Sequence, residues 1–184
     1  MSWSSFHSFY KTIISHVPLS HWVIICVLSL SFAIVIHISK KYSLYSVFAF
    51  GITTFFCLFL LETAVLIRYC GIYPHGSGYD FVAEYHRLLC PTESSWIEYI
   101  SNVAVFLPFG FFLSEFFSST KHINVWRQMG CVTKVSLLLS LCIECFQLFL
   151  NVGYFELSDI FMNTLGGLLG ANLALIVRRI IRAN

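Results

Sequence analysis

Three apolar stretches in the second half of the chain each carry two polar residues at helical spacing. The pairs are Glu98 with Asn102, Glu144 with Gln147, and Asp159 with Asn163. Residues three or four positions apart share one face of an α-helix. An ionisable residue at the centre of a spanning helix costs roughly 2.5–3.5 kcal/mol on insertion scales. This cost favours a functional role for Glu144 and Asp159, because coupled carboxylates can exchange protons or bind a polar headgroup.

The composition of the chain points to a membrane as the solvent of these stretches. Of 184 residues, 58% are hydrophobic and 11% charged, and the mean hydropathy is +0.79. An ordinary soluble domain has about 25% charged residues, and a spanning helix needs about 20 mostly apolar residues. Five stretches qualify: Val17–Ser39, Leu44–Ile67, Ile97–Phe117, Gln128–Leu150 and Ile160–Ile181. We expect an all-α, polytopic transmembrane helical bundle of about five spanning helices, forming one domain.

The distribution of Lys and Arg predicts the orientation of the bundle. Eight of these residues lie on the side of the C-terminus, and three (Lys11, Arg68 and Arg87) lie on the other side. Cytoplasmic segments carry the excess of positive charge. The N-terminus is therefore predicted to lie outside and the C-terminus in the cytoplasm.

The predicted helices divide the chain into four parts. Residues 1–16 form an interfacial segment with alternating aromatic and polar side chains. Residues 17–67 hold two spanning helices, 68–96 an extracytoplasmic loop, and 97–181 a core of three spanning helices. Cys70 and Cys90 stand at the two ends of the loop, on the oxidising side, where a disulfide and two free thiols are both compatible with the sequence.

The predicted topology places the polar pairs at one depth. The third helix enters from outside, the fourth exits there and the fifth re-enters, so all six residues lie in the outer half of the membrane as one outward-facing cluster. Glu62, on the second helix, can instead pair with Arg68 near the interface. In the cytoplasmic half of the last three helices, Lys134 is the only deep ionisable residue, so no continuous polar path is expected across the membrane.

The same stretches contain residues that favour packing. Pro108 removes a backbone donor from its helix and frees a carbonyl. Gly166 and Gly170 form a small-x-x-x-small pair, which permits close approach of another helix. The amides in the cluster are more often interhelical hydrogen-bond partners than members of a site. These amides are Asn102, Gln147 and Asn163.

Other chemistries have little support. Cys142 and Cys145 lie in an apolar stretch, where cysteine usually behaves as a small hydrophobic residue, and His75 and His86 lie in the loop. We therefore expect no metal and no cofactor. The net charge is +2 without blocks of like charge, so nucleic acid is not an expected partner.

Three motifs in the last three helices resemble those of VanZ-like membrane proteins. Residues 102–110 match N-x-x-x-F-x-P-x-G through Asn102, Pro108 and Gly110, and residues 144–147 match E-x-x-Q. Residues 153–167 are similar to the ending G-R-x-D-x-x-D-x-x-x-N-T-x-G-G/A. The matching positions there are Gly153, Glu156, Asp159, Asn163, Thr164, Gly166 and Gly167. The ordered set spans roughly residues 102–170 and ends at Gly170.

The chain departs from the family pattern at three positions. Tyr154 replaces the usual Arg, Glu156 replaces Asp, and Ser158 stands where a second acid is common. If the family site holds an anionic group through that Arg, this chain binds it differently. Arg68 or Arg87 in the facing loop could compensate.

The resemblance implies a multi-pass protein of a bacterial cytoplasmic membrane, in a family named for a member associated with resistance to the glycopeptide teicoplanin. We expect a non-enzymatic protein whose partners are the bilayer and a lipid-linked cell-wall precursor, a lipid headgroup or a lipophilic glycopeptide. An intramembrane enzyme using Glu144 and Asp159 is the alternative, and a small transporter, working as an oligomer, is a third hypothesis. A shared fold does not decide among them.

Overall fold

The computed structural model describes residues 19–38, 42–66, 78–80, 84–85, 89–120 and 124–183. The described part is helical. The helices are α2 (Leu19–Ile38), α3 (Leu44–Leu61), α6 (Glu93–Thr120), α7 (Val125–Phe149) and α8 (Leu157–Ala183), and a π-helix, η1 (Glu62–Leu66), continues α3. All five α-helices are long and apolar enough to cross a membrane. This confirms the predicted all-α transmembrane bundle.

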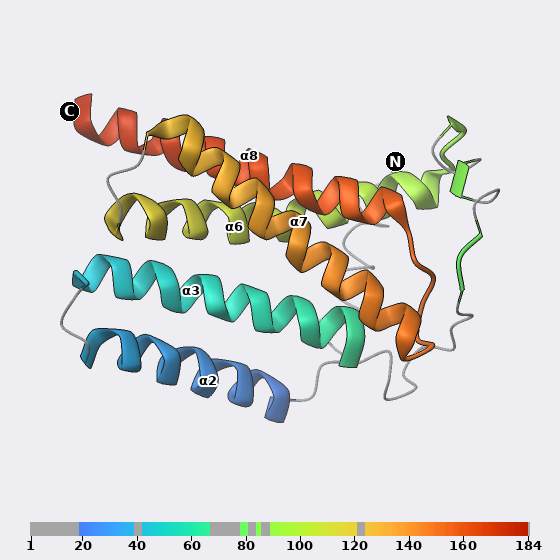
Figure 1. Cartoon of the computed structure of the whole chain (residues 1–184), viewed down its shortest axis with the longest axis horizontal. Helices are drawn as coiled ribbons and strands as arrows, with labels where there is room; N and C mark the ends of the chain where they lie inside the picture. The colour runs from blue at the N-terminus through green and yellow to red at the C-terminus, as the bar shows by residue number, and fades with distance from the viewer. Residues whose placement is uncertain are drawn as a thin grey trace.

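The helices run side by side with alternating direction (Figure 1). The starts of α2, α6 and α8 and the ends of η1 and α7 lie at one end of the bundle, together with residues 78–80. We call it the loop end. The C-terminus lies at the opposite end, which we call the C-terminal end. The boundaries agree with the predicted stretches to within a few residues, because runs of apolar residues mark spanning helices well.

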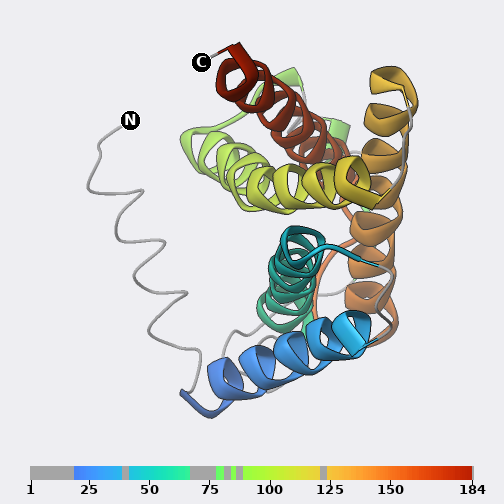
Figure 2. The same ribbon diagram turned by 90° about the vertical axis from the view of Figure 1, so that its left-hand side faces the viewer.

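α8 packs mainly against α6, and α7 packs along both of these helices. Viewed end-on, α3 lies between α2 and α6, with α8 beyond α6 (Figure 2). The core between α3, α6, α7 and α8 is filled by apolar side chains. Its most deeply buried members are Phe106, Phe109, Val132 and Ala171. Among the described helices, only α3 packs closely on α2. Much of the apolar surface of α2 is exposed to the surroundings of these helices, as expected of a helix facing lipid.

Glycines bring α6 and α8 into backbone contact. A Cβ at Gly170 would stand 2.0 Å from the carbonyl oxygen of Leu107, and one at Gly166 would stand 2.5 Å from that of Val103. A Cβ at Gly110 would stand 2.1 Å from the carbonyl oxygen of Gly167. The close approach expected from the spacing of Gly166 and Gly170 is therefore present. Only glycine fits these positions, since any side chain would push the two backbones apart.

Candidate functional site

The turn between α7 and α8 sets the position of both helix ends. Asn151 has φ +56°, in the left-handed region that asparagine tolerates better than most residues. The N–H of Val152 then donates to the carbonyl of Gln147 at 2.9 Å, which satisfies a carbonyl in the last turn of α7. The chain reverses within a few residues, and the end of α7 lies next to the start of α8 (Figure 1).

Glu144 is buried under this turn. Its side chain is 2% exposed, and its Oε2 accepts a hydrogen bond from the backbone N–H of Glu156 at 2.8 Å. Glu156 directly precedes α8, where unpaired backbone donors and the helix dipole favour a negative charge. Glu144 therefore connects α7 to the start of α8.

The carboxylate of Glu84, from the loop before α6, is also buried at the start of α8. Glu84 is 5% exposed, and its Oε1 accepts from the backbone N–H of Ser158 at 2.7 Å. The loop also contacts the residue before Glu156. The N–H of Phe155 donates to the carbonyl of Gly78 at 2.9 Å, and the ring of Phe155 packs edge-on against that of Tyr79. Sequence reasoning missed Glu84, since an isolated acid in a loop rich in Gly and Pro carries no periodic signal.

Gln147 connects the site to the first half of the chain. Its Nε2 donates to the carbonyl of Ala64 at 2.9 Å, inside the π-helix, whose widened turn alters the regular hydrogen-bond pattern. Glu62, at the start of that helix, pairs with His21 of α2. Glu62 was predicted to pair with Arg68, which lies outside the described residues.

The remaining predicted residues occupy different environments. The Nδ2 of Asn163 donates to Ser140 Oγ on α7 at 2.8 Å, within the buried interface between the two helices. Asn102 is half-buried on α6, about one turn from the exposed Glu98. Asp159 lies half-buried in the first turn of α8. The three helices thus bring all six polar residues to the loop end, where Glu144, Gln147 and Asn163 form hydrogen bonds to other elements.

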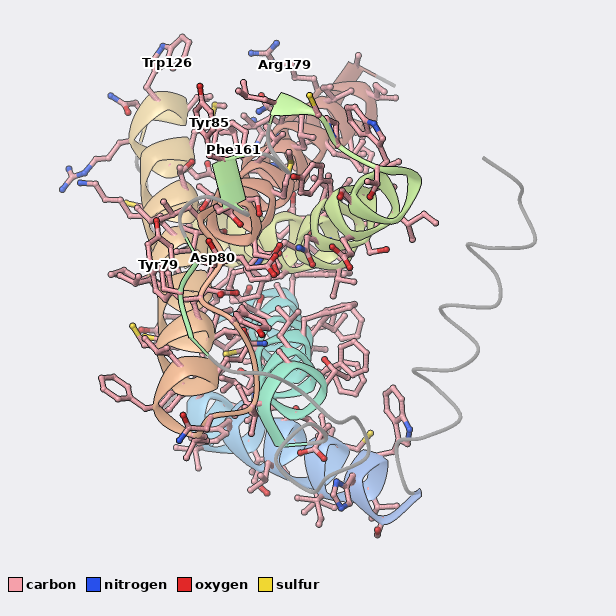
Figure 3. All side chains as sticks on the ribbon, turned by 90° about the vertical axis from the view of Figure 1, so that its right-hand side faces the viewer. Tyr79, Asp80, Tyr85, Trp126, Phe161 and Arg179 are labelled. Carbon is pink, nitrogen blue, oxygen red and sulfur yellow. The ribbon has the colours of Figure 1, made fainter. Side chains whose placement is uncertain are left out.

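Among the described residues, three acids and three tyrosines are accessible at the loop end. Asp80 is exposed, and Glu156 and Asp159 are half-buried; we call these three residues the acidic patch. Tyrosines with about half of their surface exposed belong to the same end. They are Tyr79, Tyr85 and Tyr154. Figure 3 looks at this end and labels Tyr79, Asp80 and Tyr85 near the start of α8. This surface offers acceptors and aromatic faces to a ligand rich in hydrogen-bond donors.

A second polar cluster lies at the C-terminal end. Glu115 of α6 is 3% exposed; its Oε1 lies 3.1 Å from Nε of Arg178 on α8, and the hydroxyl of Tyr45 on α3 donates to its Oε2. Ser114 Oγ accepts from Arg178 at 3.3 Å and from Gln128 of α7 at 2.8 Å. Four helices therefore meet at this cluster.

This cluster corrects one expectation. Lys134 was expected to be the only deep ionisable residue in that half of the last three helices, but it is exposed, whereas Glu115 is buried. Charge in the sequence does not tell which side of a helix faces lipid and which faces another helix.

Other predictions concern residues that the structure does not describe. Cys90 is an exposed free thiol, and Cys70, its predicted disulfide partner, lies outside the described residues. Arg68 and Arg87 also lie outside, as do residues 1–16. No group of three or more His, Cys, Asp or Glu side chains in the described ranges could hold a metal ion.

The comparisons with known proteins agree with the motif resemblance. The sequence model of the family described as VanZ/LLP1 matches residues 22–178. Protein VanZ of Enterococcus faecium is 35% identical over 78 residues, which are 41% of this chain and 43% of that protein, so the match spans less than half of either protein. No solved structure matches the chain significantly. The family match covers most of the chain, which therefore belongs to the VanZ/LLP1 family.

Proposed function

We propose that the loop end faces the outside of a bacterial cytoplasmic membrane and binds the polar head of a membrane amphiphile there. The amphiphile would be a lipid-linked cell-wall precursor, a lipid headgroup or a lipophilic glycopeptide. Binding such a molecule at the membrane surface suits the teicoplanin-resistance role associated with this family, because it would change the drug's access to its membrane-bound target.

The orientation is supported by the distribution of charge. Arg127 and Lys134 lie in the first half of α7, and Arg178, Arg179 and Arg182 in the last turns of α8. Every described Lys or Arg residue thus belongs to the half of the bundle at the C-terminal end. Positive residues favour the cytoplasmic side, which supports the proposal that the loop end faces outward.

The observation that carries the proposal is the difference between buried and accessible acids around the start of α8. Glu84 and Glu144 are buried and hold backbone N–H groups, which is a structural role. Glu156 and Asp159 are only half-buried, and Asp80 is exposed. Acids that are accessible to solvent at the headgroup level of a membrane protein, beside exposed tyrosines, can contact the polar head of an amphiphile.

The test neutralises accessible acids while leaving the buried ones intact. In the variant Glu156→Gln with Asp159→Asn, we expect binding of a lipid-linked precursor and of teicoplanin to the full chain in nanodiscs to fall about tenfold, because hydrogen bonds to charged groups are lost. The matched control, Lys134→Gln with Arg179→Gln, also removes two charges, but at the C-terminal end, and should bind as the parent does.

Equal binding by the parent and the acidic-patch variant would contradict the proposal. Turnover of a labelled polyprenyl-linked substrate by the purified parent would replace it with the enzyme alternative. Sensitivity of cells to teicoplanin should follow the binding data in the same order of variants.

A further inference from the structure

One face of α7 is exposed within the described part of the bundle and changes from basic to apolar along the helix. Arg127, Gly130 and Lys134 are exposed in its first half, and Leu138 and Leu141, farther along, are 59% and 38% exposed. Successive members are three or four residues apart, so they lie in one row. The buried residues of α7 pack on the other side of the helix, against α6 and α8. In a membrane, this row is open to lipid.

The position of Lys134 along α7 makes its charge costly in a bilayer. Trp126, at the start of the helix, is 82% exposed, and exposed tryptophans of spanning helices lie at the level of the headgroups. Lys134 follows eight residues later, about 12 Å deeper along the helix axis. A lysine at such a depth bends its side chain toward the interface to place its charge among polar groups. Helical side chains are tilted toward the N-terminus, so this bend leads from Lys134 toward Gly130 and Arg127.

The protein itself supplies no anion for these two cations. Within the described residues, the side chains of Arg127 and Lys134 have no ion pair or hydrogen bond. Glu115, the acid in that half of the described helices, is buried and paired with Arg178. The first turn of α7 contains no acid either, so the positive end of the helix dipole adds to the charge of Arg127. An anion from outside the protein would therefore be stabilised here.

Gly130 leaves room for that anion between the two cations. A Cβ at this position would meet nothing within 4 Å, whereas the glycines between α6 and α8 are required by backbone contacts. A glycine inside a helix costs about 0.5–1 kcal/mol relative to alanine, and packing within the described residues gives no reason for it here. Arg127 and Lys134 are about 10 Å apart along the axis. A phosphate at the level of Gly130 could approach the backbone and contact both long side chains.

We infer that Arg127, Gly130 and Lys134 bind the headgroup of an anionic phospholipid whose acyl chain lies along Leu138 and Leu141. The row presents cations to the phosphate and apolar side chains to the chain below it, in the order in which a phospholipid carries these groups. Charge-assisted hydrogen bonds to phosphate are stronger than neutral ones. A zwitterionic headgroup brings its own cation, which is repelled by the two basic side chains. The site lies at the end of the bundle opposite to the acidic patch and does not depend on the proposed function.

Two arginines of α8 provide a comparison at the same end of the bundle. Arg179 and Arg182 are exposed and three residues apart, and Figure 3 labels Arg179 near the same edge of the bundle as Trp126. They lie in the last turns of their helix, where a cation is favoured by the helix dipole and can remain in water. We expect them to add a general attraction to an anionic membrane surface without holding one lipid.

The test compares two lipids with identical acyl chains. The full chain is purified in detergent with an equimolar mixture of phosphatidylglycerol and phosphatidylcholine, and the lipids retained are measured by native mass spectrometry. We expect phosphatidylglycerol to be retained about tenfold over phosphatidylcholine, because only its phosphate has an uncompensated charge. Inorganic phosphate added in excess should not release the retained phosphatidylglycerol, since it has no acyl chain to contact the leucines. Release by inorganic phosphate would show an anion site without lipid recognition and would overturn the inference.

Matched variants locate the preference. Arg127→Gln with Lys134→Gln should abolish most of it, whereas Arg179→Gln with Arg182→Gln makes the same change of net charge at the same end and should keep it within about twofold of the parent. Gly130→Leu keeps every charge but fills the space between the two cations, and should reduce the preference severalfold. All of these positions are exposed, and circular dichroism of each variant should match the parent.

Three results would overturn the inference. The first is equal retention of both lipids by the parent. The second is an equal loss of preference in the two double variants, because general attraction by net charge would then explain the data. The third is full preference in Gly130→Leu, which would place the lipid elsewhere than between Arg127 and Lys134. None of these results bears on headgroup binding at the acidic patch, which is tested by variants at the other end.

Discussion

The carboxylate of Glu84 accepts a hydrogen bond from the backbone N–H of Ser158, a residue 74 positions later in the chain, at 2.7 Å. This contact joins the loop after the second spanning helix to the first turn of the last one. It works as an N-cap supplied from a distant segment rather than from the residue that precedes the helix. The start of α8 is therefore positioned by the loop as well as by α7.

Removal of the Glu84 cap should destabilise the start of α8. Glu84→Ala is expected to cost about 1–2 kcal/mol, as for loss of a helix cap, whereas Glu84→Gln keeps an acceptor oxygen and should cost less. Unfolding by SDS in mixed micelles gives the free energies, and hydrogen exchange at residues 157–160 shows whether the effect is local. Glu98→Gln, at an exposed position, is the control. Equal stability of Glu84→Ala and the parent would show that the cap contributes nothing.

Alanine substitution of two glycines should change the stability in opposite directions. Gly170→Ala places a Cβ 2.0 Å from the carbonyl oxygen of Leu107, so the backbones must separate at a cost of about 3 kcal/mol or more. Gly130→Ala, in α7, meets nothing within 4 Å and should stabilise by about 0.5–1 kcal/mol, because alanine favours the helix. The same unfolding measurement tests both variants, and destabilisation of both would contradict the assigned environments.

Removal of one partner of the ion pair between Glu115 and Arg178 should destabilise the protein more than replacement of both partners by uncharged residues. Arg178→Met leaves Glu115 buried with an uncompensated charge, which should cost about 3–5 kcal/mol. The double variant Arg178→Met with Glu115→Gln removes both charges and should recover a large part of that loss. A double-mutant cycle on SDS unfolding measures the coupling. Additive effects of the two changes would mean that the pair does not interact energetically.

The hydrogen bond between Asn163 and Ser140 should contribute modestly. Interhelical hydrogen bonds in membrane proteins average about 0.6 kcal/mol in double-mutant cycles. We expect Asn163→Ala and Ser140→Ala to show a coupling of about that size, because both groups are buried in the interface between α7 and α8. Thr133→Ala is a suitable control, since its hydroxyl bonds only within α7, to the carbonyl of Met129. If the coupling between Thr133 and Asn163 were as large as that between Ser140 and Asn163, the hydrogen bond from Asn163 to Ser140 would not be its cause.

Much of the architecture could be read from the amino-acid sequence. Five apolar runs of about 20 residues predicted five spanning helices, because unpaired backbone groups are too costly in lipid for other open structures. The alternation of those helices placed the pairs of polar residues at one end. The spacing of Gly166 and Gly170 predicted close helix contact, and the ordered motifs predicted the family. All of these signals are local or depend only on chain order.

The partners of the polar side chains were decided by the tertiary structure. Periodicity defines the faces of one helix but not the rotation of its neighbour or the path of a loop. The pairing of Gln147 with Ala64, across 83 positions, and of Glu115 with Arg178 could not be inferred for that reason. Glu84 gave no signal at all until the loop was folded against α8. Sequence alone determined which residues lie in the membrane and at which end, whereas the packing of helices and loop decided which carboxylates are buried as structural groups and which remain accessible to solvent.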